Sequence, residues 1–306
     1  MLCNLKEAAR IAIAENSGLP AFNVFGYEDA AAVINAAERM NRPVVLMTNK
    51  VAVAHMGIPV LAGMLLEMAR RSEVPTCVHL DHATELADIR QAVDSGYTSV
   101  MIDGSHHSFE ENIAVTKRVV EYAHDHGVWV EAELGRLAGV EEDVSSEHSI
   151  YTDPDQAVEF VRRSGCDSLA IAIGTSHGAY KFKGEAKLDF DRLETIGKLL
   201  PGYPLVLHGA SSVPKQFVDM CNAYGGKVAG AAGVPEELLR KAAGMAICKI
   251  NIDTDIRLAM TASIRKHLVE HPEEFDPRGY LKPARQAVKD MVQHKIKNVL
   301  GCSGKA

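Results

Sequence analysis

Short β-rich segments alternate with amphipathic helical segments along the whole chain, and this alternation limits the possible folds more than any other feature. Each β-rich run is followed by a stretch whose apolar residues recur at helical spacing. Eight strands are predicted, at Pro20–Phe25, Pro43–Thr48, Pro75–Leu80, Thr98–Asp103, Val128–Glu133, Ser168–Gly174, Pro204–His208 and Ala246–Ile252. The helices between them are predicted at Glu28–Met40, Leu61–Arg71, Glu85–Asp94, Phe109–His126, Asp155–Arg163, Phe190–Leu199 and Pro214–Tyr224. Eight strand-then-helix units in 306 residues predict an α/β protein, a closed (β/α)₈ TIM barrel formed by one domain, residues 1–306.

An open, doubly wound sheet is the rival architecture, and it usually carries a glycine-rich dinucleotide-binding turn after its first strand. The turn after Val24 reads Phe25-Gly26-Tyr27-Glu28 and has no such pattern. Before the barrel, Met1–Asn16 is predicted to form an amphipathic helix. After it, we expect a helix at Arg257–His267, an exposed loop at Phe275–Tyr280 and a last helix at Pro283–Val299. These extra C-terminal helices exceed what a barrel needs and are expected to reach a neighbouring subunit.

Charge and composition exclude two classes of partner. The net charge is −7 and the Lys and Arg residues are scattered, so the electrostatic attraction needed for nucleic acid is missing. No apolar run reaches the roughly 18 residues needed to span a membrane. The six cysteines show no CxxC spacing, which is typical of buried thiols in a reducing compartment. We therefore expect a cytoplasmic protein.

Three histidines occupy equivalent positions at the carboxyl ends of predicted strands, where a barrel has its active site. They are His82, His177 and His208. Each of them alone would more often be a structural histidine. Three imidazoles that converge on one cleft instead predict a divalent metal site, most naturally zinc with an open coordination position.

Other polar residues end the same strands. Asp81 precedes His82 directly, and Glu131 and Glu133 share one face of the fifth strand. Beyond them, the glycine-containing segment Leu134–Asp143 could carry a mobile acid, although Glu142 and Asp143 are better explained as a solvated loop. Glycines at 178 and 209, with Ser211, Lys181, Asn251–Thr254 and Arg257, predict phosphate binding after the last strands, whereas any one of them alone would indicate only a turn.

These motifs together resemble the class II, metal-dependent ketose-bisphosphate aldolases, the group with fructose-1,6-bisphosphate and tagatose-1,6-bisphosphate aldolases. The resemblance covers nearly the whole chain, and the motifs occur in the family's order. They are Pro20-Ala21-Phe22-Asn23-Val24, His79-Leu80-Asp81-His82, Met101-Ile102-Asp103-Gly104-Ser105-His106, Glu131-Ala132-Glu133-Leu134-Gly135, Gly174-Thr175-Ser176-His177-Gly178-Ala179-Tyr180-Lys181, Leu207-His208-Gly209-Ala210-Ser211-Ser212, Asn251-Ile252-Asp253-Thr254-Asp255 and Asp276-Pro277-Arg278. The chain departs from the family pattern at Phe25–Glu28, Thr48–Lys50 and Ala138–Val140, which flank the distal half of the substrate or the loop.

The resemblance implies a role for each matching residue. It implies a catalytic zinc ion on His82, His177 and His208, with a monovalent cation (Na⁺ or K⁺) near one phosphate. Asp81 would be the acid/base at the substrate C4 hydroxyl and Glu141 the loop acid at C3, while Asp103 and Glu133 would support the metal or hold a second one. The C1 phosphate and dihydroxyacetone end would meet Gly178, Lys181, Gly209, Ser211, Asn251, Asp253 and Thr254. The distal phosphate would meet Thr48, Arg257 and Arg278, the last from a neighbouring subunit of a homodimer or homotetramer. Asn23 would also bind substrate.

The implied reaction is reversible cleavage of a ketose 1,6-bisphosphate, most naturally fructose 1,6-bisphosphate, to dihydroxyacetone phosphate and glyceraldehyde 3-phosphate. Tagatose 1,6-bisphosphate or another ketose phosphate is the alternative substrate. A Schiff-base aldolase would need a buried lysine, for which Lys249 is the one good candidate, but it would leave the histidines unexplained. A non-catalytic assembly partner of a related aldolase is the third alternative.

Overall fold

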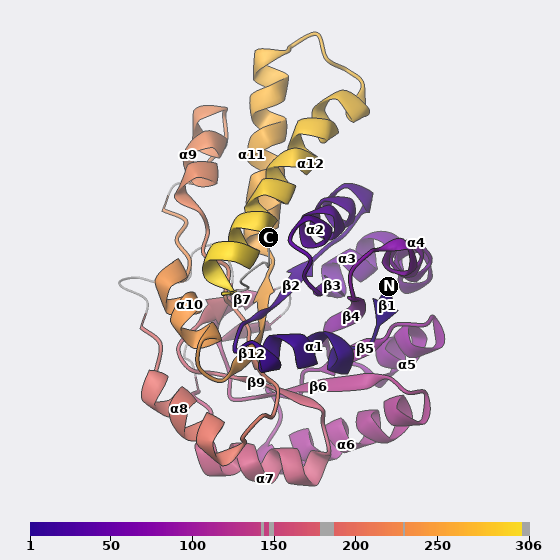
Figure 1. The fold of residues 1–306 in the computed structure, drawn as a ribbon, viewed down its shortest axis with the longest axis vertical. Coiled ribbons are helices and arrows are strands. Elements are labelled where there is room, and N and C mark those ends of the chain that lie inside the picture. Colours follow the sequence, from indigo (N-terminus) through magenta and orange to yellow (C-terminus); the bar gives the residue numbers. More distant parts are fainter. Residues whose placement is uncertain (142–143, 147–149, 178–186, 229, 302–306) are drawn as a thin grey trace.

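Eight parallel strands close into a barrel, which confirms the predicted architecture (Figure 1). The computed structural model describes residues 1–141, 144–146, 150–177, 187–228 and 230–301. Around the barrel the strands follow the order β4, β3, β2, β12, β11, β9, β6 and β5, and β5 pairs with β4 to close the ring. Their bounds are β2 Leu19–Asn23, β3 Val44–Thr48, β4 Thr76–Ala83, β5 Ser99–Ile102, β6 Trp129–Leu134, β9 Ser168–Ile171, β11 Leu205–Leu207 and β12 Ile247–Ile252.

Helices cover the outside of the barrel (Figure 1). Side chains that accept backbone N–H bonds define where several of them begin: Asn49 caps α3, Ser108 caps α6 and Asp153 caps α7. The sequence did not predict the short helices α3 and α10. The helices are α2 Tyr27–Arg39, α3 Lys50–Met56, α4 Ile58–Arg71, α5 Leu86–Asp94, α6 Phe109–Asp125, α7 Pro154–Ser164, α8 Phe190–Leu199, α9 Lys215–Ala223 and α10 Glu236–Ala243.

Alternation along each strand separates two hydrophobic clusters. In β2, Phe22 joins the cluster between the strands and the outer helices, whereas Leu19 and Ala21 join a second cluster inside the barrel.

The helix predicted at Met1–Asn16 is shorter in the structure. The strand β1 (Leu2–Cys3) pairs with β4, and the helix α1 (Leu5–Ala14) starts only after its cap, Asn4. The buried face of α1 packs on the inner cluster.

A small second sheet lies where the sequence predicted a mobile loop. Strands β7 (Ala138–Glu141) and β8 (Val144–Ser146) pair antiparallel, and the short strand β10 (Ser176–His177) pairs parallel with β7. The backbone of Gly139 is the partner of His177 in this sheet. The segments after β6 and β9 are thus joined to each other by backbone hydrogen bonds.

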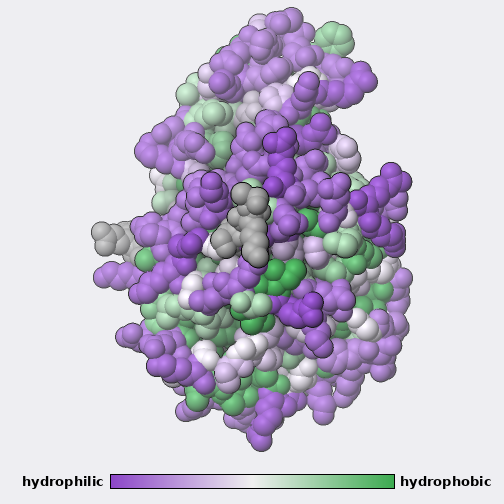
Figure 2. Space-filling view, viewed as in Figure 1, coloured by the Kyte–Doolittle hydropathy of each residue, from purple (hydrophilic) through white to green (hydrophobic). Residues whose placement is uncertain are grey.

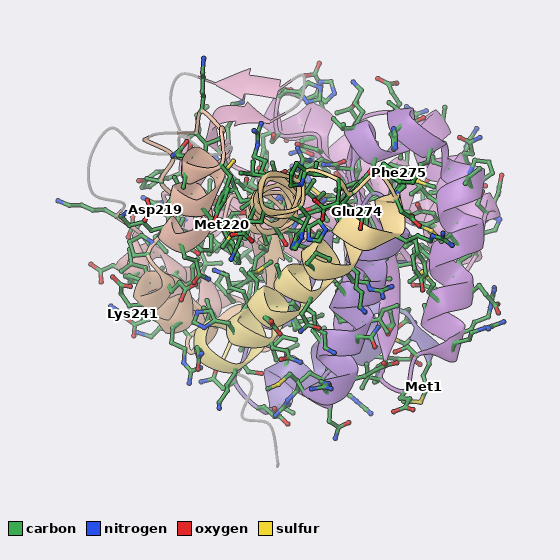
Figure 3. All side chains as sticks on the ribbon, turned by 90° about the horizontal axis from the view of Figure 1, so that it is seen from above. Met1, Asp219, Met220, Lys241, Glu274 and Phe275 are labelled. Carbon is green, nitrogen blue, oxygen red and sulfur yellow. The ribbon has the colours of Figure 1, made fainter. Side chains whose placement is uncertain are left out.

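Two long helices form an arm that extends beyond the barrel (Figure 1). Helix α11 (Thr254–Glu270) follows β12 directly, and α12 (Pro277–His294) returns beside it and packs on α2. Figure 3 looks down on this arm, with Glu274 and Phe275 at the turn between its helices. Figure 2 shows that the surface of the arm is mostly hydrophilic, so Phe275, which is 91% exposed, is an exception there.

The predicted loop at Phe275–Tyr280 is wrong from Pro277 onward. Asp276 caps α12 by accepting the N–H of Arg278, and Pro277 occupies the first turn, so the helix begins before Tyr280. Pro283 lies inside this helix and does not start it. A π-helix, η1 (Lys295–Val299), follows α12.

Two expectations from composition can be compared with the structure. Within the described residues, no single helix has the length and apolar character to cross a membrane; only α3 and α4 together would qualify, and they are bent by 101°. The apolar residues of α4 are buried in the outer core. Five cysteines are free and buried, as predicted, at positions 3, 77, 166, 221 and 248; Cys302 lies outside the described residues.

Candidate active site

A bulge in β4 brings Asp81 and His82 into the same cleft. Adjacent residues of a regular strand point to opposite faces. Here, however, the pairing with β5 passes from Leu80↔Val100 to Ala83↔Ile102, so β4 contains one residue more than its partner. His82 takes up this excess in a left-handed conformation with φ of 49°, which is uncommon outside glycine. Both side chains therefore reach the carboxyl end of the barrel.

Asp81 is held between two asparagines from neighbouring strands. The side-chain amide of Asn23 donates to Oδ2 over 2.8 Å, and that of Asn251 donates to Oδ1 over 3.1 Å. Asp81 is buried, with 2% exposure. These bonds fix the carboxylate in one orientation, as a proton-transfer group requires.

His82 is oriented by Asp103. Its Nδ1 lies 3.0 Å from Asp103 Oδ2 and 3.9 Å from Glu133 Oε2. Burial raises the pKa of Asp103, but the hydrogen bonds from His82 and Ser105 outweigh it and hold that pKa well below its usual range. A carboxylate that bonds to one ring nitrogen of a metal-binding histidine fixes the orientation of the ring.

His208 lies between two carboxylates of β6. Its Nε2 is 2.8 Å from Glu131 Oε1, and its Nδ1 is 3.1 Å from Glu133 Oε2. Burial and His82 lower the pKa of His208, but the bonds to Glu131 and Glu133 prevail and raise it to about 9. The rings of His82 and His208 stand edge to face with centroids 4.6 Å apart.

Lys249, the lysine predicted as the candidate for a Schiff base, forms an ion pair inside the barrel. Its Nζ lies 2.9 and 3.1 Å from the two oxygens of Glu131, and both side chains are buried. Burial alone would raise the pKa of Glu131, but Lys249 and His208 lower it well below its ordinary range. A lysine held as a charged partner is not a free amine nucleophile.

The backbone brings the segments of His177 and Glu141 to the same end of the barrel. Gly209 has φ of 60°, and a Cβ at this position would lie 2.7 Å from the carbonyl oxygen of Ser176, so the loop after β11 lies directly on the strand of His177. The side chains of Glu141 and His177, and all of Gly178 and Lys181, lie outside the described residues.

The loop after β11 is tied to the start of α11. The hydroxyl oxygen of Ser211 accepts the N–H groups of Asp253 and Thr254 over 3.1 and 3.2 Å. Asp255, which is buried, accepts the N–H groups of Ser212 and Val213. The positive end of α11 thus lies beside Ser211, at the place where barrels often bind phosphate.

A cavity of about 420 Å³ opens beside Asn23, the residue that donates to Asp81. Asn23, Asn49, His55, Asp253 and Arg257 line it together with apolar residues. Arg257 reaches the cavity as an ion pair with Asp253, with 2.6 Å between Nη2 and Oδ2.

Two residues predicted for the distal end have other surroundings in this chain. Thr48 is fully buried, and its hydroxyl bonds to that of Tyr97 over 2.9 Å. Arg278 lies on the arm, paired with Asp276 and largely exposed. The structure thus brings Asn23, Asp253 and Arg257 together and does not bring Thr48 or Arg278 to them.

The donor set at the mouth fits a divalent metal ion. One ligand atom each from Asp81, His82 and His208 lie within 4.8 Å of one another, and the same holds for His82, Asp103 and Glu133. Imidazole nitrogens with buried carboxylates are suitable ligands for zinc and related ions. The two groups share His82, so neighbouring positions for metal exist in one cleft.

Fold and cleft together define a (β/α)₈-barrel enzyme whose active-site end carries residues able to hold a metal. Residues 3–305 match the family model described as fructose-bisphosphate aldolase class-II. The fructose-bisphosphate aldolase of Thermus caldophilus is 48% identical, with full coverage of both chains, and that of Giardia intestinalis is 47% identical, covering 100% of this chain and 94% of the relative. The crystal structure of the YdjI aldolase from Escherichia coli K12 superimposes with a TM-score of 0.82 at 32% identity and full coverage of both chains. The chain belongs to the class-II fructose-bisphosphate aldolase family and is a carbon–carbon lyase.

Sequence reasoning missed three residues that shape the site. The sequence placed Asp255 in a motif without predicting a role for it, and it predicted no role for Lys295 or Tyr97. Lys295 lies far along the chain in η1 and bonds to Asp255 over 2.9 Å. The sequence carried no signal for this contact, because it joins residues 40 positions apart.

Proposed function

We propose that this protein cleaves fructose 1,6-bisphosphate reversibly to dihydroxyacetone phosphate and glyceraldehyde 3-phosphate, with zinc on His82, His177 and His208. The observation that carries the proposal is the fixed carboxylate of Asp81, whose ligand atom lies within 4.8 Å of those of His82 and His208. A base beside a site for a Lewis acid is what aldol cleavage requires. The names and identities of the relatives support fructose bisphosphate as the substrate.

The chain's own residues divide the proton transfers. A bound zinc ion supplies the Lewis acidity that polarises the C2 carbonyl. Asp81 removes the proton of the C4 hydroxyl as the C3–C4 bond breaks, the bonding pair passes to the C2–C3 enediolate, and the C4 carbon leaves as the aldehyde. Glu141 then protonates C3 to give dihydroxyacetone phosphate. Asn23 and Asn251 hold Asp81 for this transfer.

The phosphate groups bind on either side of Asp81. In the proposal, Gly178, Lys181, Gly209, Ser211, Asn251, Asp253 and Thr254 hold the C1 phosphate and the dihydroxyacetone end, with a Na⁺ or K⁺ ion near that phosphate. Asn23 and Arg257 serve the distal end; both line the 420 Å³ cavity, which supports its use by the sugar's distal half. Asp103 and Glu133 orient the metal ligands or hold a second ion.

The proposal extends to the setting of the enzyme. We expect residues 1–306 to act as one catalytic domain in the cytoplasm, within a homodimer or homotetramer. Arg278 of a neighbouring subunit would reach the distal phosphate, which is consistent with its position on the exposed arm.

A panel of ketose phosphates tests the function. Purified protein is given fructose 1,6-bisphosphate, tagatose 1,6-bisphosphate or fructose 1-phosphate, with and without a chelator, and release of dihydroxyacetone phosphate is measured. We expect the fastest release from fructose 1,6-bisphosphate, loss with chelator and recovery with zinc. Faster release from tagatose 1,6-bisphosphate would reassign the substrate. The mechanism would be overturned if the activity resisted the chelator and borohydride trapped the substrate on a lysine.

A further inference from the structure

Glu131 and Lys249 form a buried ion pair beneath the cleft, and the proposed reaction gives neither of them a task. Their exposed fractions are 0% and 1%. Both oxygens of Glu131 lie within 3.1 Å of Lys249 Nζ. Taking two charges out of water is costly, and a buried ion pair is weak evidence for stability, so the pair calls for another explanation.

The pair contacts the active site through one atom. Oε1 of Glu131 lies 2.8 Å from Nε2 of His208. The other ring nitrogen, Nδ1, faces Glu133, which belongs to the metal-capable group with His82 and Asp103. Glu131 is two residues earlier on the same strand face and therefore lies deeper in the barrel than Glu133. Of the two nitrogens, Nδ1 is therefore on the side of the metal-capable group.

The two carboxylates differ in how firmly they are held. Glu133 lies at the mouth and could itself approach a metal ion. Glu131 cannot turn away without breaking both contacts with Lys249. A carboxylate that is locked in this way fixes both the rotation of the histidine ring and the nitrogen that carries the proton.

We infer that Glu131 and Lys249 are positioning residues that hold His208 through Nε2, so that Nδ1 is the atom presented to the metal. Lys249 keeps Glu131 in place through both of its oxygens, and Glu131 accepts the Nε2–H bond. This inference rests on the proposed role of His208 as a metal ligand. It gives the buried lysine a purpose other than covalent catalysis.

Three variants of the full chain separate positioning from packing. Lys249→Met removes the counter-charge, and Glu131→Gln removes the carboxylate but keeps an amide oxygen. The double variant Glu131→Gln/Lys249→Met removes both charges with little change in volume, so it should fold even where a single variant, with one unpaired charge, does not. Zinc affinity is measured by competition with a chromophoric chelator, and the ring protonation of His208 by ¹⁵N NMR. Urea unfolding of the zinc-free proteins reports stability separately.

We expect zinc affinity to fall about 10- to 100-fold in all three variants, including a double variant that unfolds at the same urea concentration as the wild type. In the wild type, ¹⁵N shifts should show the proton of zinc-bound His208 on Nε2. Affinities within twofold of the wild type, or zinc bound through Nε2, would overturn the inference.

The variant His208→Gln distinguishes this failure from failure of the proposed function. If His208→Gln loses zinc while the three variants retain it, only the positioning role is wrong. If His208→Gln retains full zinc affinity, His208 is not a ligand and the proposed metal site is wrong as well.

Discussion

Asp81 and His82 are neighbours in sequence with different tasks, and the structure allows a test that separates them. We predict that Asp81→Ala lowers kcat about 10²- to 10⁴-fold, the usual contribution of a positioned acid/base. Zinc content should stay at the wild-type level, because Asp81 is assigned to proton transfer. Metal analysis of the purified variant, beside a kinetic assay, checks both parts. A variant that loses its zinc would show that Asp81 is a ligand, since its carboxylate lies in a metal-capable group with His82 and His208.

The buried residue His79 should make the stability of the folded protein depend on pH. His79 is fully buried, with its Nδ1 2.8 Å from the hydroxyl of Ser99. Burial, helped by the charge of Lys249, lowers its pKa from 6.5 to about 3. The unfolded chain therefore binds more protons between these two values, so the folded state loses stability as the pH falls from 6.5 towards 3.

At pH 5 this histidine should cost on the order of 2 kcal/mol of unfolding free energy relative to pH 7. The measurement is urea unfolding of the zinc-free protein at both pH values, beside His79→Gln, which keeps a polar contact for Ser99 but does not titrate. All other groups titrate in both proteins. The wild type should therefore lose more unfolding free energy than His79→Gln between pH 7 and pH 5. Equal losses would show that His79 is not the responsible group.

Among the structural elements, the loop after β11 depends most on distant parts of the chain. Val213 has φ of 52°, a strained conformation for a β-branched residue, and its N–H is held by Asp255 over 2.8 Å. Lys295 of η1 lies 2.9 Å from Asp255 and 2.6 Å from Glu236, and it also bonds to the hydroxyl of Ser212. The end of the chain thus holds the loop that the proposal assigns to phosphate.

We predict that Lys295→Met costs about 3–5 kcal/mol of unfolding free energy, because it leaves the buried carboxylate of Asp255 without its cation. Lys215→Met is the matched control: Lys215 pairs with Asp219 on the surface, where such pairs contribute about 0–1 kcal/mol. Urea unfolding of both variants measures the difference. Similar small losses in the two proteins would mean that Lys295 does not stabilise the loop.

The elements also show what the sequence could and could not predict. The strands were predictable because alternation and helical periodicity are local patterns, and they placed Asp81, His82 and His208 at one end of the barrel. The bulge that turns His82 was not, because it depends on the register between β4 and β5. Thr48 was expected at the distal phosphate, but its contact with Tyr97 depends on a residue 49 positions away. The contact between Lys295 and Asp255 joins the last helical turn to the start of α11 and leaves no periodic trace.

At the scale of the whole molecule, the arm is the part that the barrel does not explain. Helices α11 and α12 extend beyond the body of the protein (Figure 1), and the turn between them exposes Phe275 (Figure 3). Val269, near the end of α11, is 60% exposed. In the proposed homo-oligomer, a neighbouring subunit would cover these side chains. A homo-oligomer in which each arm reaches a neighbour's cleft would account for Arg278 on the arm.

This arrangement predicts complementation between two variants that are impaired in different ways. Arg278→Ala should weaken binding of the distal phosphate and raise KM about 10-fold or more, since an arginine–phosphate contact is a strong charge-assisted one. Asp81→Ala should lack the base. Because each site would take Asp81 from one chain and Arg278 from another, subunits mixed after mild dissociation should form some sites with both residues intact, and activity should rise above that of either variant alone. Light scattering first checks that the protein is oligomeric and that its subunits have exchanged. If the mixture is then no more active than the average of the two variants, Arg278 does not act across the interface.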